Sequence, residues 1–154
     1  AQQGEAVEEA SAKLKALQVL SGTTQVSGPG LQLEIRDPNG QVSYGSLVDA
    51  VQELRDAGAE ALTINGNRVG ATSALTQQNG HIALDGIELS APYRLDAIGP
   101  ASTMEGGLKI PGGALDTLGA LNGVTVDVRR SNNLQMPALT NTPTFRVARP
   151  IGSK

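Results

Sequence analysis

Residues 31–64 change their hydrophobic period twice, and this constrains the fold more than any other feature of the chain. Apolar and polar residues alternate from Leu31 to Ile35, which is the pattern of a half-buried strand. Apolar residues then recur at helical spacing over 45–57, and an apolar run follows over 61–64. A strand, a helix and a strand in this order predict a right-handed βαβ unit.

Tight turns follow this unit. The dipeptides Asn79-Gly80 and Asp85-Gly86 favour the positive φ angles of two-residue hairpin turns. We therefore expect three short strands around them, at 71–75, 81–84 and 87–89.

The second half repeats the order of the first. A strand is expected at 92–99, and Ser102 to Glu105 has the spacing of a capping box that starts a short helix. A second helical turn is expected from Pro111, a strand at 124–128, and an edge strand at 134–139, where Pro137 is tolerated. The chain is predicted to be α+β, with the order β-α-β, hairpin insert, β-α-β of the ferredoxin-like split βαβ plan.

An N-terminal helix is predicted over residues 5–20. Its apolar residues are spaced three, four and three apart, as in a coiled-coil seam. Two interpretations stay open: self-association through this seam, or an amphipathic helix that packs on its own domain. The seam residues are Val7, Ala10, Leu14 and Leu17.

These patterns divide the chain into three parts: a helix at 1–24, a globular domain at 25–140 and a loosely ordered tail at 141–154. No run approaches the roughly 20 apolar residues that span a bilayer. The chain begins with Ala1 rather than Met, so we expect an upstream segment to have been removed.

Composition argues against several functions. A formal net charge of -3 and only three aromatic residues lack the basic, stacking surface of nucleic-acid-binding domains. The absence of cysteine excludes disulfides, thiol catalysis and Cys-ligated zinc, and it suits an oxidising compartment.

Catalytic residues are not predicted. His81 is the single histidine, it follows a hairpin turn, and no nucleophile-elbow sequence accompanies it. Glycine pairs at 106–107 and 112–113 lack the Lys-Ser/Thr of a phosphate-binding loop. We expect a protein that is not an enzyme and needs no metal or cofactor.

One polar cluster has the residue types of a ligand site. Asn65, Asn67 and Arg68 follow the second strand of the βαβ unit, and Tyr93 is a further candidate. At the end of a strand Arg68 is expected to reach solvent, and it has the donors to hold an anionic group. The alternative is a strand-ending turn in which Asn and Gly supply positive φ.

Several stretches together resemble the YlxW/YlxX-like bacterial family, a membrane-anchored domain of unknown function, over about residues 5–140. The most specific is the run from Leu54 through Ala57-Gly58-Ala59-Glu60-Ala61 to Asn67-Arg68-Val69. The others are Gly28-Pro29-Gly30-Leu31, Ala91-Pro92-Tyr93, Ala97-Ile98-Gly99 and Leu134-Gln135-Met136-Pro137-Ala138.

The resemblance implies a single-pass protein of the cell membrane, with a transmembrane helix outside this chain, a coiled-coil segment and this domain on the extracytoplasmic side. It implies genes near those of cell division or the envelope, and it supplies no catalytic residues. We therefore expect a non-enzymatic interaction module for envelope or division proteins. A domain that binds a small anionic ligand through the Asn65–Arg68 region is the alternative.

Overall fold

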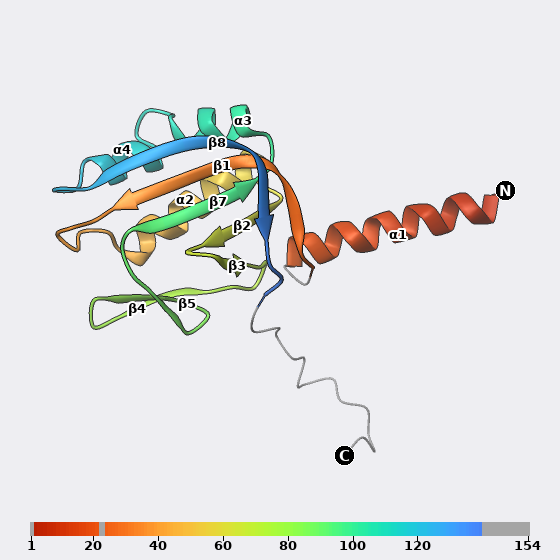
Figure 1. Cartoon of the computed structure of the whole chain (residues 1–154), viewed down its shortest axis with the longest axis horizontal. Coiled ribbons are helices and arrows are strands. Elements are labelled where there is room, and N and C mark those ends of the chain that lie inside the picture. Colours follow the sequence, from red (N-terminus) through yellow and green to blue (C-terminus); the bar gives the residue numbers. More distant parts are fainter. Residues whose placement is uncertain (1, 22–23, 140–154) are drawn as a thin grey trace, which may run out of the picture.

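The protein is an α+β domain with antiparallel sheets, preceded by a helix (Figure 1). The structure, a computed structural model, describes residues 2–21 and 24–139, and the tail predicted at 141–154 lies outside them. The helices are α1 (Gln2–Ser21), α2 (Tyr44–Asp56), α3 (Ala101–Leu108) and α4 (Ala114–Gly119). The strands are β1 (Val26–Arg36), β2 (Ala61–Ile64), β3 (Asn67–Val69), β4 (Leu75–Gln78), β5 (His81–Leu84), β6 (Ile87–Leu89), β7 (Tyr93–Ile98) and β8 (Thr125–Met136).

A five-stranded sheet of order β3-β2-β7-β1-β8 forms the body of the domain, and all its neighbouring strands are antiparallel. The crossover from β1 through α2 leads to β2, and β7 lies between β1 and β2 in the sheet. Strands β4, β5 and β6 form a separate three-stranded sheet, which is the predicted hairpin insert.

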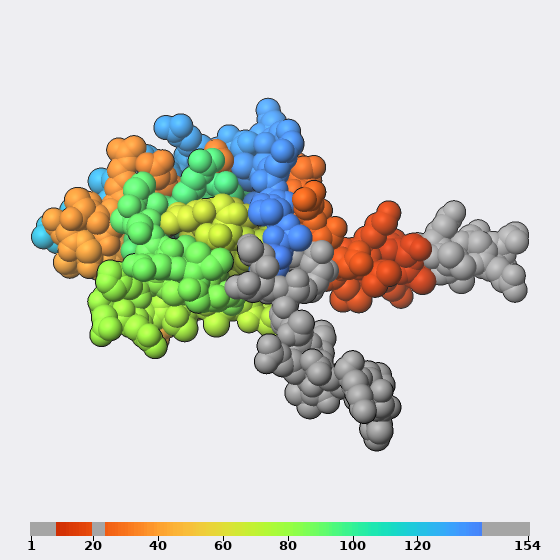
Figure 2. Space-filling model, turned by 60° about the horizontal axis from the view of Figure 1, so that its bottom comes forward, coloured from red at the N-terminus to blue at the C-terminus, as the bar shows by residue number. Residues whose placement is uncertain are grey.

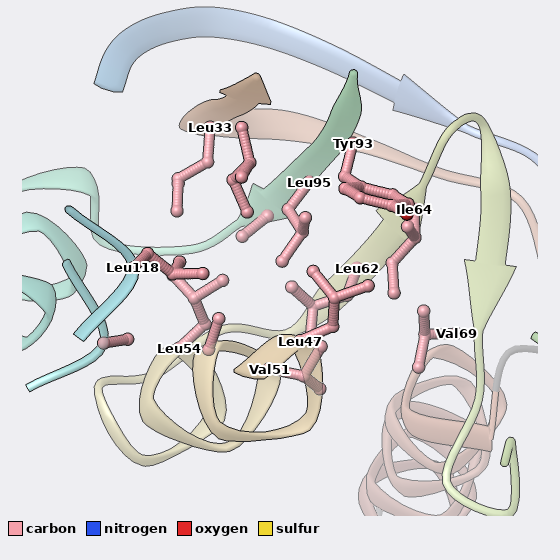
Figure 3. Close-up of a cluster of buried hydrophobic side chains, with 14 of the residues drawn as sticks. Leu33, Leu47, Val51, Leu54, Leu62, Ile64, Val69, Tyr93, Leu95 and Leu118 are labelled. Carbon is pink, nitrogen blue, oxygen red and sulfur yellow. The ribbon is translucent and has the colours of Figure 1, made fainter. Parts of the chain in front are cut away.

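The core lies between one face of the large sheet and helices α2, α3 and α4. The inward residues of β1 are fully buried, as their alternation predicts. Leu47, Val51 and Leu54 of α2 pack against them, and Figure 3 shows Tyr93 and Leu95 of β7 in the same cluster. Aliphatic side chains dominate this core because the chain has few aromatic residues.

Positive-φ dipeptides set three hairpins. Asn65-Gly66, Asn79-Gly80 and Asp85-Gly86 all have positive φ at both residues, which is the geometry of the two-residue turns that match strand twist. The first of them joins β2 to β3, a strand that the sequence did not predict.

The boundaries of other elements differ from prediction. Residues 71–74 are not a strand: Ser73 Oγ accepts from Gly70 N in a local turn, and Ala74 N donates to Oδ1 of Asp85 in the turn between β5 and β6. The predicted capping box is absent: α3 begins at Ala101 after Pro100, without a side-chain cap. The strands predicted at 124–128 and 134–139 are parts of one strand, β8, because both halves pair with β1.

Candidate interaction site

Helix α1 projects from the domain (Figures 1 and 2). Leu14 is 56% and Leu17 is 62% exposed, and Ala10 is also exposed. The side chain of Val7 lies outside the described residues. Because Leu14 and Leu17 contact so little, the interpretation that this stripe packs on its own domain is wrong.

Val19 makes the contact with the domain in place of the seam. It packs against a small cluster of Ala61, Ile98, Leu134 and Met136 beside the open face of the sheet. Residues two positions apart in a helix are separated by about 200° around the axis, so Val19 and Leu17 face opposite directions. The anchored side of α1 therefore directs the Leu14–Leu17 side away from the domain.

Arg68 also joins the end of α1 to the domain, by hydrogen bonds from its side chain to main-chain oxygens. Its Nη2 donates to the carbonyl oxygen of Val19 at 2.7 Å, and its Nη1 donates to those of Thr24 at 2.7 Å and Pro137 at 3.0 Å. One side chain of β3 thus joins the end of α1, the segment that enters β1 and the residue that follows β8. Three segments far apart in sequence meet at one guanidinium.

The environment of Arg68 differs from that of a ligand site. The residue is 2% exposed, and burial lowers the pKa of its guanidinium, which nevertheless stays charged at neutral pH. Its acceptors are main-chain carbonyls, and the carbonyl of Val19 lies near the negative end of the α1 dipole. Nε makes no hydrogen bond and is buried. The expectation that Arg68 reaches solvent is wrong, because the ends of α1 and β8 fold over it.

Asn65 and Asn67 bind the protein's own backbone. Asn65 Oδ1 accepts from Arg94 N at 2.8 Å, and its Nδ2 donates to the carbonyl of Ser90 at 3.0 Å. Asn67 Nδ2 donates to the carbonyls of Ile64 and Asn65, which closes the turn. Both amides therefore stabilise the β2–β3 hairpin and its junction with β7.

Tyr93 lies in the core and not beside the guanidinium donors. It is 8% exposed and lies next to Ile64 in Figure 3, and burial raises the pKa of its phenol, with a smaller contribution from the charge of Asp37. A groove of about 380 Å³ lies nearby, lined by Arg55, Glu60 and apolar residues that include Val69. None of Asn65, Asn67, Arg68 and Tyr93 lines that groove, so the structure does not gather them around it.

His81 is exposed, and its Nδ1 lies 2.9 Å from Glu88 Oε1 across the small sheet. Within residues 2–21 and 24–139, no three His, Asp or Glu side chains are placed to hold a metal ion. In the same part of the chain, no helix has the length and apolar character needed to cross a membrane.

The anchoring residues of α1 were missed from the sequence. Val19 lies outside the three-four-three stripe, and that apolar residue on the opposite side of the helix was the available signal. The role of Arg68 had no local signal, because its acceptors lie 44, 49 and 69 residues away.

The fold and the contacts of Arg68 and Val19 define an α+β domain that carries an outward-pointing N-terminal helix. The chain belongs to the family described as "Bacterial protein of unknown function (DUF881)", whose model matches residues 13–149. The predicted resemblance to the YlxW-like family is thereby confirmed.

Named relatives give the same assignment. The chain is 35% identical over 150 residues to UPF0749 protein Rv1825 of Mycobacterium tuberculosis, covering 95% of this chain and 51% of that protein. It is 28% identical over 131 residues to UPF0749 protein YlxW of Bacillus subtilis, covering 79% of this chain and 56% of the relative. The chain thus spans about half the length of the curated relatives it matches.

A solved structure is similar in fold. The crystal structure of an uncharacterized conserved protein from Mycobacterium tuberculosis superimposes with a TM-score of 0.80 at 34% sequence identity. The match covers 90% of this chain and 99% of that chain.

Proposed function

We propose that this chain is a non-enzymatic interaction module that pairs with a second copy through α1. The observation that carries the proposal is the exposure of Leu14 and Leu17 on a helix whose opposite side is anchored at Val19. Two exposed leucines on one face of a projecting helix gain free energy by leaving water. Their spacing is that of facing positions in a coiled coil.

The anchor favours a second copy as the occupant. A helix held at one end by Val19 and Arg68 has a defined direction, so less orientational freedom is lost when two copies pair. Lys13 and Gln18 occupy the positions flanking the seam, and a lysine facing a glutamine in a parallel pair brings no like charges together. The face therefore suits an identical helix.

We further propose that the domain acts on the extracytoplasmic side of the cell membrane, in a single-pass protein, with envelope or cell-division proteins as partners. The support is the resemblance to the YlxW-like family together with the absence of cysteine, which suits an oxidising compartment. The ligand-binding alternative lacks a comparable observation, because Nη1 and Nη2 of Arg68 already donate to main-chain oxygens.

We propose the ferredoxin-like split βαβ plan as the finer description of the fold. Its support is the order β2-β7-β1-β8 with antiparallel neighbours, in which each half contributes a strand–helix–strand crossover. On this description, β3 and the three-stranded sheet are additions between the two halves. Fold alone implies no activity, so this assignment does not bear on the interaction proposal.

The test of pairing is a charge substitution in the seam. Leu14→Glu/Leu17→Glu should lower the sedimentation mass at high protein concentration, because two charges would face two charges at a desolvated seam. Ala12→Glu/Ala16→Glu is the matched control, since these exposed residues lie on another side of the same helix. Equal masses for both variants and the parent would refute pairing through α1.

A further inference from the structure

Strand β8 is an edge of the five-stranded sheet with its outer side open among the described residues. Figure 1 shows it as the blue strand at the rim of the domain, and Figure 2 shows the same segment on the surface. Open edges carry unpaired N–H and C=O groups, and natural proteins shorten or protect them. Strand β8 is long for an open edge. Which of its N–H and C=O groups point outward therefore decides what the edge can pair with.

The hydrogen-bonding pattern shows which residues point outward. Gly99 N donates to the carbonyl of Pro29, so the odd-numbered residues of β1 point toward β7. Because the direction alternates along an antiparallel strand, Gln32 and Glu34 point toward β8, where their partners are Arg129 and Asp127. The main-chain groups of Val126, Val128 and Arg130 therefore point away from the sheet.

The straight part of this edge is short and bounded. Residues 125–131 pair with β1 in one register, and the register then shifts where Asn132 and Asn133 lie opposite Pro29. Such a bulge bends a strand away from its line. The available segment is thus 125–131, and Val128 is its middle residue.

The side chains of this segment are self-complementary about Val128. Asp127 and Arg129 are exposed on the open face of the sheet, and Val126 and Val128 are half-buried on the helical face. We propose that β8 pairs with β8 of a second copy, antiparallel and centred on Val128. The two sheets then form one continuous sheet.

This register satisfies both the main chain and the charges. Val128 faces its own copy, Val126 faces Arg130, and these outward-pointing residues exchange their N–H and C=O bonds. Between them, Asp127 of each copy lies opposite Arg129 of the other, in the closer type of antiparallel pair, with Cα atoms about 4.5 Å apart. Registers centred on Asp127 or Arg129 place like charges opposite each other, so the charges select Val128 as the centre.

Existing ion pairs leave these groups available. Within the described residues, no ion pair of Arg129 is found, and Asp127 has only the distant contact at 4.0 Å with Arg36. Arg130 binds Glu105 on α3 through its Nε, which leaves its stem beside Val126 of the other copy. The β8 edge is a different surface from the Leu14–Leu17 face of α1. A chain that pairs through both surfaces therefore binds two other copies.

A charge exchange tests the inference independently of α1. In the Leu14→Glu/Leu17→Glu background, Asp127→Arg and Arg129→Asp should each raise the dimer Kd roughly tenfold or more, because each creates two like-charge pairs. Mixing these two variants should restore association, since every charge at positions 127 and 129 then faces an opposite charge in the other copy. The double exchange Asp127→Arg/Arg129→Asp should also restore it, whereas a variant that only misfolds is not rescued by mixing.

A cysteine in place of Val128, the central residue, tests the register in which the two β8 strands pair. The chain has no cysteine, so Val128→Cys places one thiol on the two-fold axis, and paired strands hold such residues within disulfide distance. Oxidation should yield a disulfide dimer, while the exposed control Ser90→Cys should not under the same conditions. Sedimentation of the parent background as a monomer at high concentration, or equal cross-linking of the two thiols, would overturn pairing through β8. Equal sedimentation masses of the parent, Leu14→Glu/Leu17→Glu and Ala12→Glu/Ala16→Glu, with retention of the Val128→Cys disulfide dimer, would refute only the proposed function.

Discussion

Nη2 of Arg68 donates a 2.7 Å hydrogen bond to the main-chain oxygen of Val19, which joins an edge strand of the sheet to the end of the projecting helix. The carbonyls at a helix C-terminus have no partner within the helix, and a cation beside them is stabilising. The same guanidinium holds Thr24 and Pro137, so the direction of α1 is tied to the start of β1 and the end of β8. The buried arginine therefore holds the end of α1 in place on the domain.

Arg68→Ala is expected to destabilise the protein by about 2–4 kcal/mol, because three main-chain oxygens lose a charged donor in a buried place. Urea unfolding measures the change. Arg94→Ala is the matched control: Arg94 is exposed and pairs with Asp96, so its loss should cost less than about 1 kcal/mol. Equal effects of the two substitutions would show that the Arg68 contacts contribute little.

Gly30→Ala is expected to destabilise the domain by about 1–3 kcal/mol or more, because β1 and β7 approach closely at this residue. An added Cβ would lie 1.8 Å from the carbonyl oxygen of Ala97, which belongs to the backbone and cannot rotate away. Gly106→Ala in α3 meets no atom within 4 Å and should be neutral or stabilising by up to about 1 kcal/mol. Thermal unfolding of both variants checks the contrast, and a stable Gly30→Ala protein would contradict it.

Glu105→Gln should reduce stability slightly near neutral pH and not at acidic pH. Hydrogen bonds from Lys109 and Arg130 lower the pKa of Glu105 below its ordinary value of 4.5. A carboxyl with a lowered folded-state pKa stabilises the fold above its unfolded pKa, and this contribution is lost as pH falls through the folded value. Urea unfolding at about pH 7 and about pH 3 should therefore give a gap that closes in acid. A gap that is equal at both pH values would contradict the assignment.

His81→Ala should leave biological activity intact, as expected if the protein is a binding module. Histidine is the side chain that most often serves as general acid or base, so His81, the single histidine, is the default general base of a cysteine-free hydrolase. Losing a true acid–base catalyst typically lowers the rate about a hundredfold to ten-thousandfold. Complementation of a deletion strain at normal expression is the measurement. A folded His81→Ala protein that fails to complement would contradict this prediction and favour a hydrolase.

The local patterns predicted those elements whose burial follows a simple period. Alternation from Leu31 to Ile35 identified β1, and the helical stripe over 45–57 identified α2, because each presents one face to the core. The dipeptides at 79–80 and 85–86 identified both turns of the small sheet, since their preference for positive φ is intrinsic. The predictions of where α3 starts and of a strand at 71–75 were wrong. In both places the local sequence signals were weak, and side-chain contacts and tertiary pairing overrode them.

The candidate site residues were predicted less well than the helices and strands. Asn65 is a turn residue with positive φ, as the simpler interpretation predicted, whereas Asn67 begins β3, and the side-chain amides of both bind the backbone. Tyr93 alternates inward on β7 and lies in the core, whereas Arg68 faces a junction that has no sequence signature. Exposure of Leu14 and Leu17 likewise could not be read from their spacing, because a seam and a packed helix share that spacing.

The sequence by itself determined the turns, the periods of β1 and α2 and the three-four-three stripe of α1, because these depend on intrinsic φ preference and on residues close along the chain. Only the tertiary structure decided that Arg68 lies buried beneath the ends of α1 and β8, and that the outer edge of β8 presents Val126, Val128 and Arg130. Both results depend on segments tens of residues apart being brought together by the pairing of the sheet. The direction of a main-chain N–H, and the burial of a charge, are properties of that assembled sheet and of no local stretch of the chain.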